Sequence, residues 1–183
     1  MKHIVFIVGS YYPYYSAVGK CMRNIANEFE KNYKVTVICE KNMVDQADKD
    51  VLNTQKIIRV TTKMHNKRIM IDDKMKKSQG IKRHYWRCRL YMSKVERFVK
   101  VAISKSACDK DVVSAYMDGL KRICEPIDVI IPTCNPFDTV VAALQYKRLY
   151  PNVQIIPYLF DLFAANLNVN RGKALLYLVN VKI

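Results

Sequence analysis

Short, uninterrupted apolar runs recur along this chain and constrain its fold more than any other feature. Runs of this kind, rich in β-branched residues, predict strands that are buried on both faces, as in a parallel sheet. Segments in which apolar residues have helical spacing follow most of these runs. The strands are expected at 3–8, 33–40, 56–62, 127–133 and 152–160, and the helices at 18–32, 109–123, 136–150 and 173–183.

Strands that alternate with helices predict an α/β fold. We expect a three-layer α/β/α Rossmann-like sandwich with a mostly parallel sheet, in which the first helix crosses over between two parallel strands. Residues 1–183 suit a single domain. The polar segment 41–55 is expected to be a loop.

Positive charge is concentrated in one part of the chain. The net charge is +15, and residues 56–105 alone hold 16 Lys or Arg against three acidic residues. We interpret about 63–105 as a basic insert, with a surface loop at 66–80 and a helix from Ile81 onward. Such an insert predicts an anionic partner. The apolar stripe expected along its helix is Ile81, Tyr85, Leu90 or Met92, Val95, Val99 and Ile103.

The helix of the basic insert has two interpretations. Cations interleaved with aromatic rings are typical of a helix that lies in an anionic membrane interface. Alternatively, the helix packs its stripe on the sheet and leaves a solvated basic face. The charge would also support non-specific nucleic-acid binding, although no known nucleic-acid-binding motif is present. The residues assigned to membrane contact are Lys76, Lys77, Lys82, Arg83, Trp86 and Arg87.

The loop after the first strand is the first candidate binding site. In parallel α/β sheets, ligands bind beyond the carboxyl ends of the strands. A glycine at the start of the next helix would let a phosphate approach backbone N–H groups; alternatively, Gly19 only eases a turn and the tyrosines pack as a lid. The segment matches neither a dinucleotide fingerprint nor a P-loop. The candidate acceptor- or phosphate-binding residues of this loop are Tyr14, Tyr15, Ser16, Gly19 and Lys20.

Three polar residues follow later strands. Asn135 and Asp138 come after the strand at 127–133, where Asn135 is an N-cap or a site residue. Asp161 follows the strand at 152–160 and either orients an acceptor hydroxyl, as a catalytic residue, or caps a turn. His3, His65 and His84 are interpreted as structural or solvated side chains.

Cysteine spacing and the N-terminus bear on the compartment. Six cysteines without a C-x-x-C pair argue against a zinc site and a disulfide framework, and they predict reduced, buried thiols. No ligand cluster suggests a metal, and no bound cofactor is expected. There is no signal-peptide pattern, and no apolar run reaches the roughly 18 residues that span a bilayer. We therefore expect a cytoplasmic protein, with peripheral binding to the inner face of the cell membrane as one option.

The start of the chain, "MKHIVFIVGSYYPYYSAVGKCMRNIANEFEKNYKVTVICEKN", resembles a family 4 glycosyltransferase with the GT-B fold. The later "PIDVIIPTCNPFDTVVAALQYKRLYPNVQIIPYLFDLF" is similar to a strand–helix–strand unit of the same family. Two departures are Ala17, where the family has the first glycine of a pair, and Phe160, where some relatives have a histidine. The matching positions are Tyr12, Pro13, Ser16, Gly19, Ile25, Ala26, Phe29 and 35–38.

The resemblance implies the acceptor-side, N-terminal half of a retaining glycosyltransferase that works without a bound metal. Such an enzyme moves a hexose from UDP- or GDP-hexose to a polysaccharide or lipid-linked acceptor. The C-terminal donor-binding domain has no counterpart here, so this resemblance predicts a fragment, a truncated product or half of a split enzyme, inactive alone. The alternative is a basic, non-catalytic α/β binding module, either a partner of a separate donor-domain chain or a nucleic-acid binder.

Overall fold

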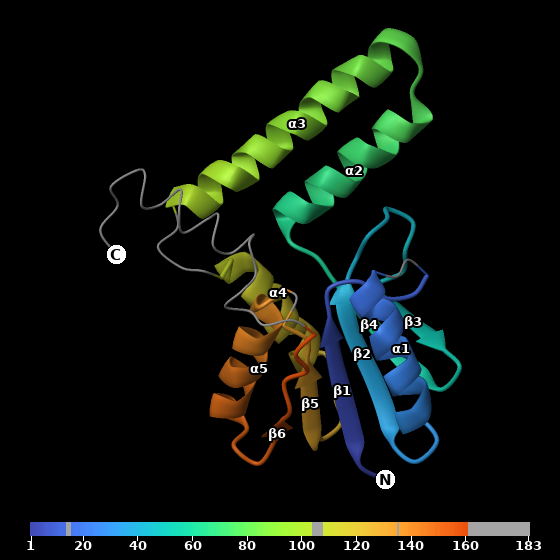
Figure 1. The fold of residues 1–183 in the computed structure, drawn as a ribbon, viewed down its shortest axis with the longest axis vertical. Coiled ribbons are helices and arrows are strands. Elements are labelled where there is room, and N and C mark those ends of the chain that lie inside the picture. Colours follow the sequence, from blue (N-terminus) through green and yellow to red (C-terminus); the bar gives the residue numbers. More distant parts are fainter. Residues whose placement is uncertain (14–15, 104–107, 135, 161–183) are drawn as a thin grey trace.

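Six strands form a single sheet in the order β3–β4–β2–β1–β5–β6 in the computed structural model of the protein (Figure 1). The structure describes residues 1–13, 16–103, 108–134 and 136–160. All neighbouring strands are parallel except β3 and β4, so the predicted α/β class with a mostly parallel sheet is confirmed. The strands are β1 (His3–Val8), β2 (Lys34–Glu40), β3 (Lys49–Leu52), β4 (Gln55–Val60), β5 (Val129–Pro132) and β6 (Gln154–Ile155).

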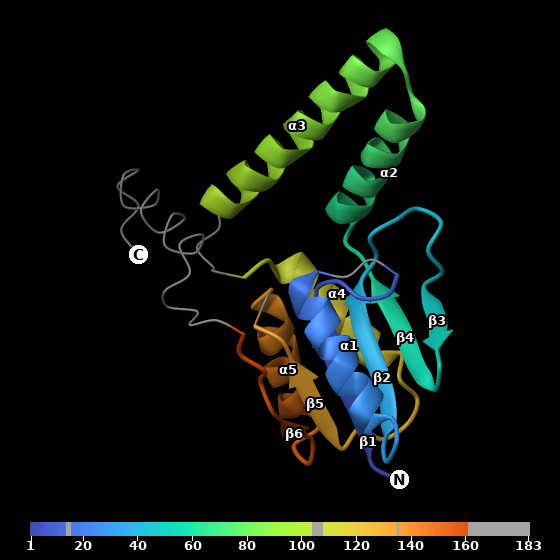
Figure 2. The same ribbon diagram turned by 45° about the vertical axis from the view of Figure 1, so that its right-hand side comes forward.

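Helices cover both faces of this sheet (Figures 1 and 2). Helix α1 (Ala17–Phe29) packs on one face, and α4 (Lys110–Lys121) and α5 (Asp138–Leu149) pack on the other. Alternate residues of β1 point to the two sides: Phe6 joins the cluster under α1, and Ile7 joins the cluster under α4 and α5. Every residue of β1 is buried, which explains why its sequence is an uninterrupted apolar run.

Several element boundaries differ from the sequence-based expectation. The expected loop 41–55 contains β3, an antiparallel strand at the edge of the sheet. Helix α5 begins at Asp138 rather than at Pro136, and its N-cap residue is Phe137. Strand β6 covers two residues of the expected 152–160, extended by an isolated bridge from Thr133 to Tyr158. The helix expected at 173–183 lies outside the described residues.

The expected surface loop at 66–80 is wrong, because this segment is largely helical. Helix α2 (Lys63–Lys77) begins after Thr62, whose Oγ1 accepts a hydrogen bond from the backbone N–H of His65 at 3.1 Å. Lys76 and Lys77 pair with carboxylates one turn earlier, at Asp72 and Asp73. A side-chain cap and pairs at i,i+4 both stabilise a helix, although the segment has little apolar character.

Helix α3 (Gly80–Ile103) begins where the pattern predicted, and it lies beside α2. We call α2 and α3 together, residues 63–103, the helical hairpin. Figures 1 and 2 show the hairpin projecting beyond the sheet at the end where the parallel strands have their carboxyl ends. Two contacts between charged side chains and their partners join the helices. Lys67 forms an ion pair with Glu96 at 3.1 Å, and the ammonium group of Lys74 makes a cation–π contact with the ring of Trp86.

Candidate functional site

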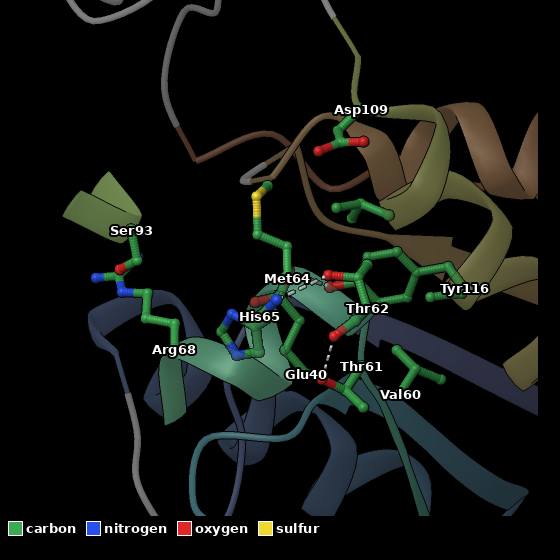
Figure 3. A pocket seen from close by; sticks show the side chains of 12 residues that line it. Glu40, Val60, Thr61, Thr62, Met64, His65, Arg68, Ser93, Asp109 and Tyr116 are labelled. Carbon is green, nitrogen blue, oxygen red and sulfur yellow. Dashed lines mark hydrogen bonds between the residues drawn. The ribbon is translucent and has the colours of Figure 1, made fainter. Parts of the chain in front are cut away.

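A cavity of about 80 Å³ lies at the base of the helical hairpin (Figure 3). Its wall includes Glu40 and Val60, the last residues of the neighbouring strands β2 and β4. The hairpin contributes Arg68 and Ser93, and α4 contributes Tyr116. The cavity therefore sits at the carboxyl ends of parallel strands, where ligand sites of open α/β sheets form.

The carboxylate of Glu40 is held in place by a buried tyrosine. The hydroxyl of Tyr116 is 3.3 Å from Glu40 Oε1 and 3.3 Å from the carbonyl oxygen of Val8, and it donates to both. Tyr116 is fully buried. Burial, followed by the charge of Glu40, raises the pKa of Tyr116 well above its usual value. Tyr116 therefore stays protonated and acts as a donor to Glu40 at neutral pH.

Helix α2 adds a histidine and an arginine to the same cavity. His65 Nε2 lies 2.8 Å from the carbonyl oxygen of Lys41. A carbonyl only accepts, so Nε2 carries the proton and Nδ1 is the acceptor of the neutral ring. Arg68 follows three residues later, on the same side of the helix. The first two turns of α2 therefore supply an acceptor nitrogen and a guanidinium.

The carboxylate of Asp109 completes the polar lining and ties the hairpin to the sheet domain. Asp109 is the N-cap of α4, and its Oδ1 accepts from the backbone N–H of Asp111 at 3.0 Å. Lys100 Nζ, from α3, lies 2.8 Å from Asp109 and 2.6 Å from Asp111. These bonds raise the pKa of Lys100. The C-terminal part of α3 is thereby attached to the start of α4.

The cavity combines opposite charges with hydroxyl groups. Two carboxylates face one guanidinium and a histidine, and the remaining walls are hydroxyl-bearing or apolar. Such a lining both donates and accepts hydrogen bonds, and it carries no excess of positive charge for a phosphate. Its chemistry suits a neutral ligand rich in hydroxyl groups. A cavity of this size holds a few hydroxyl groups rather than a whole sugar ring.

The predicted β1–α1 loop is a separate feature, because Ser16, Gly19 and Lys20 are not part of the cavity wall. Ser16 caps α1: its Oγ accepts from the backbone N–H of Gly19 at 3.1 Å. A Cβ at Gly19 would collide with the carbonyl oxygen of Ser10. The chain itself therefore makes a close approach to this glycine, and Lys20 is exposed. A ligand role for these residues stays a prediction.

Two of the five remaining candidate positions belong to the same loop. Tyr14 and Tyr15 lie outside the described residues, as do Asn135 and Asp161. Asp138 is described, and its Oδ1 accepts from the backbone N–H of Asp109 at 2.7 Å. Asp138 thus supports a residue of the cavity wall from behind, at the start of α5.

The residues assigned to membrane contact fall into two groups. Lys76 and Lys77 pair with Asp72 and Asp73 on their own helix, and Trp86 is half-buried with Lys74 Nζ 5.0 Å from the ring centre. The other three, Lys82, Arg83 and Arg87, are exposed on α3. The alternative in which the stripe of α3 packs on the sheet is wrong, because the described side chains Ile81, Tyr85, Met92, Val95 and Val99 are exposed.

Within the described residues, thiols and ligand clusters add no second chemical site. All six cysteines are free, and Cys21, Cys88 and Cys124 are exposed, so the expectation of buried thiols is wrong for half of them. Burial raises the pKa of Cys39 to about 12, which leaves its thiol protonated. Among the described residues, no group of three or more His, Cys, Asp or Glu side chains could hold a metal ion.

Sequence reasoning missed Glu40, His65, Arg68 and Asp109. Glu40 ends a buried strand at its carboxyl end, which is a signal that could have identified it. Within the part of the chain that the structure describes, no helix has the length and apolar character to cross a bilayer. A scan against models of known protein families finds no match to this chain, and a search of curated proteins finds no relative.

Proposed function

We propose that this domain is the acceptor-binding half of a retaining glycosyltransferase, and that the cavity at the base of the hairpin receives a hydroxyl-rich acceptor. The donor would be UDP- or GDP-hexose, and the acceptor a polysaccharide or a lipid-linked glycan. The described residues form one sheet, so the donor-binding unit of this proposal would be supplied from outside them. The protein would act in the cytoplasm, at the inner face of the cell membrane.

The lining of the cavity carries this proposal. Carboxylates of Glu40 and Asp109 accept hydrogen bonds from sugar hydroxyls, and Arg68 donates to sugar oxygens. Because Tyr116 orients Glu40 before a ligand arrives, little ordering cost remains at binding. In transfer, these groups would position the acceptor hydroxyl toward the donor, which is a contribution of orientation rather than of covalent chemistry.

The arrangement of the elements supports the same proposal. Strands β1 and β2 are parallel and joined by α1, as in the opening unit of the resembling family. We extend the observed sheet with helices on its two faces to a three-layer Rossmann-like domain of the GT-B type. The β1–α1 loop, with Gly19, would line the other side of the acceptor cleft.

Binding of free sugars to the isolated protein tests the proposal directly. NMR titration with glucose, galactose, mannose and their disaccharides is expected to shift backbone amides around Thr61, Thr62 and His65. Glu40→Gln, which keeps an acceptor for the Tyr116 hydroxyl, should weaken binding at least tenfold. The matched control Glu28→Gln removes a carboxylate on the exposed surface of α1 and should leave binding unchanged.

Transfer assays provide the second arm. Radiolabelled UDP- and GDP-hexoses with a lipid-linked oligosaccharide fraction should give no product above background with this chain alone. Turnover by the isolated chain would contradict the half-enzyme proposal. Sugar binding that is insensitive to Glu40→Gln, or no binding at millimolar sugar, would remove the cavity as the acceptor site and favour the non-catalytic alternative.

A further inference from the structure

Helix α3 presents an apolar stripe to solvent along most of its length. Its members recur at alternating spacings of four and three residues, so they form one face of the helix. Their exposed fractions run from 45% at Val99 to 89% at Ile81, and Cys88 between them is also exposed. Soluble proteins rarely leave a contiguous apolar surface of this kind exposed unless it contacts a partner. The stripe consists of Ile81, Tyr85, Cys88, Met92, Val95 and Val99.

The helical hairpin does not need this stripe to hold together. The side of α3 that meets α2 is a different one: it includes Ser93, which is 4% exposed, and the half-buried Trp86 under Lys74. Glu96 reaches Lys67 of α2 at 3.1 Å. The exposed stripe is therefore an additional apolar surface, beyond the contacts that join the two helices.

Cations border the stripe on both sides. At 100° per residue, Lys82 and Arg89 lie along one edge, together with Glu96. On the other side the exposed Tyr91 and Phe98 widen the apolar face, and Arg87 and Lys94 lie beyond them. No acidic side chain in the described part of the chain pairs with any of these four cations. Long basic side chains beside an apolar face can extend outward and place their charges in a polar layer above it.

Charge selects among the surfaces that could cover the stripe. The helical hairpin holds thirteen Lys and Arg against three acidic residues, a net charge of +10. A second copy of the chain would bring this charge against itself. A nucleic acid would neutralise the charge but leave the apolar stripe uncovered. An anionic lipid surface satisfies both features, since its phosphates face the cations and its acyl region takes the apolar side chains.

We propose that α3 lies in the plane of an anionic lipid surface, with its stripe in the boundary between headgroups and acyl chains. Its 24 residues extend for about 36 Å at 1.5 Å per residue, so the contact is long and shallow. This proposal does not depend on the glycosyltransferase activity. Because Ser93 of α3 also lines the cavity, the lipid contact would bring that cavity close to the surface, and under the proposed function the acceptor is a lipid-linked glycan.

Co-sedimentation with vesicles tests the lipid contact. The full chain is mixed with vesicles of phosphatidylglycerol and phosphatidylcholine in equal parts, or of phosphatidylcholine alone, at 50 and 300 mM salt. We expect binding to the anionic vesicles only, weaker at the higher salt. The fluorescence of the single Trp, Trp86, should change little, because this ring faces α2.

Two sets of variants separate the apolar and the ionic contributions. Met92→Gln with Val95→Gln removes the centre of the stripe and should weaken vesicle binding at least tenfold, without a change in charge. Its matched control is Leu144→Gln with Leu149→Gln, two equally exposed apolar residues of α5. The triple reversal of Lys82, Arg83 and Arg87 to Glu should also abolish binding, whereas reversing Lys110, Lys121 and Lys147, exposed on α4 and α5, should have a small effect.

Every outcome bears on the lipid assignment. Loss of binding in both hairpin variants, with both controls near wild type, supports it. If the stripe variant binds vesicles like the wild type while single-stranded RNA competes with them, the hairpin is a polyanion site and the proposal is wrong. If sedimentation shows a dimer that the stripe variant dissociates, the stripe joins two copies, which also overturns it. Far-UV circular dichroism of each variant checks that the helices remain.

Discussion

The α/β body, residues 1–62 and 108–160, and helix α3 of the helical hairpin use apolar residues in opposite ways. In the body, β1 is buried along its whole length, and its side chains enter clusters on both faces of the sheet. In α3, a helix four times as long in residues, Ser93 is the one buried side chain among those described. Apolar residues of the body therefore stabilise the fold, whereas those of α3 remain available for a partner.

Charged groups show the same contrast. Arg59 in the body is 2% exposed and donates to the carbonyl oxygens of Ala47 and Tyr12 and to Asp50. The hairpin pair of Lys67 and Glu96 is half-exposed at both ends. Removing a partner from a buried charge destabilises the fold strongly, whereas an exposed ion pair contributes little to stability. The body should thus be sensitive to single substitutions that the hairpin tolerates.

The largest expected difference comes from one substitution made in both regions. Ile7→Ala empties part of the core and should lower the free energy of unfolding by about 2–5 kcal/mol. Ile81→Ala removes the same atoms from an exposed position. This substitution should change the free energy of unfolding by less than about 0.5 kcal/mol. Urea unfolding, followed by circular dichroism, measures both. Equal losses would show that the stripe of α3 is packed in the folded protein, and the contrast between the regions would be wrong.

Removing one carboxylate from each ion pair should give a smaller difference. The hydrogen bond from Arg59, above the other contributions, lowers the pKa of Asp50. Asp50→Asn leaves the buried guanidinium with a weaker partner and should cost about 1–3 kcal/mol. Glu96→Gln should cost less than about 1 kcal/mol, and less at high salt. If both variants unfold at the same urea concentration, burial of Arg59 does not distinguish the two regions.

The smallest expected effect is a difference in pH dependence between two histidines. His3 is buried, and burial lowers its pKa. Its Nδ1 lies 3.1 Å from the carbonyl oxygen of Pro126 and its Nε2 2.8 Å from Thr36 Oγ1, which fits a neutral ring that donates through Nδ1 and accepts at Nε2. Below about pH 6.5, His3 binds a proton in the unfolded chain but stays neutral in the folded protein down to a lower pH. Stability should therefore fall on acidification, by at most about 1.4 kcal/mol per pH unit from this residue.

Urea unfolding at pH 7.5 and pH 5.5 tests this effect. His3→Gln should reduce the loss of stability between the two pH values. His84→Gln, at an exposed position of α3, should keep the loss of the wild type. An unchanged pH dependence in His3→Gln would assign the loss of stability to a group other than His3. Glu125 is not that group, because hydrogen bonds from Lys34 and Lys56 lower its pKa to about 2, so its contribution is lost only at a pH below this range.

The sequence predicted those elements whose signal lies in their own residues. Strands β1, β2, β4 and β5 are apolar runs, and α1, α3 and α4 have helical spacing, so local patterns were enough. Strand β3 has no such pattern; it is a polar edge strand that pairs with β4 and holds Asp50 against Arg59. Helix α2 was missed because its stabilising features are a cap and charge pairs rather than an apolar stripe.

The candidate cavity could be predicted only in part. Glu40 follows a buried strand, so its place at the carboxyl edge of the sheet is readable from the sequence. Its neighbours in the cavity, Arg68, Asp109 and Tyr116, come from elements far along the chain. Which of these elements meet depends on β4 lying next to β2 and on α4 lying over both, and no local pattern encodes that order.

By itself, the sequence determined the α/β class, the parallel sheet and the presence of a basic amphipathic helix, because each is a periodic property of neighbouring residues. Only the tertiary structure decided where the apolar stripe of α3 points and that a cavity forms beneath the hairpin. The physical reason is that periodicity defines an apolar face without naming what covers it. A stripe turned toward the sheet and one turned toward solvent have the same sequence, and only the packing of α2 against a different side of α3 distinguishes them.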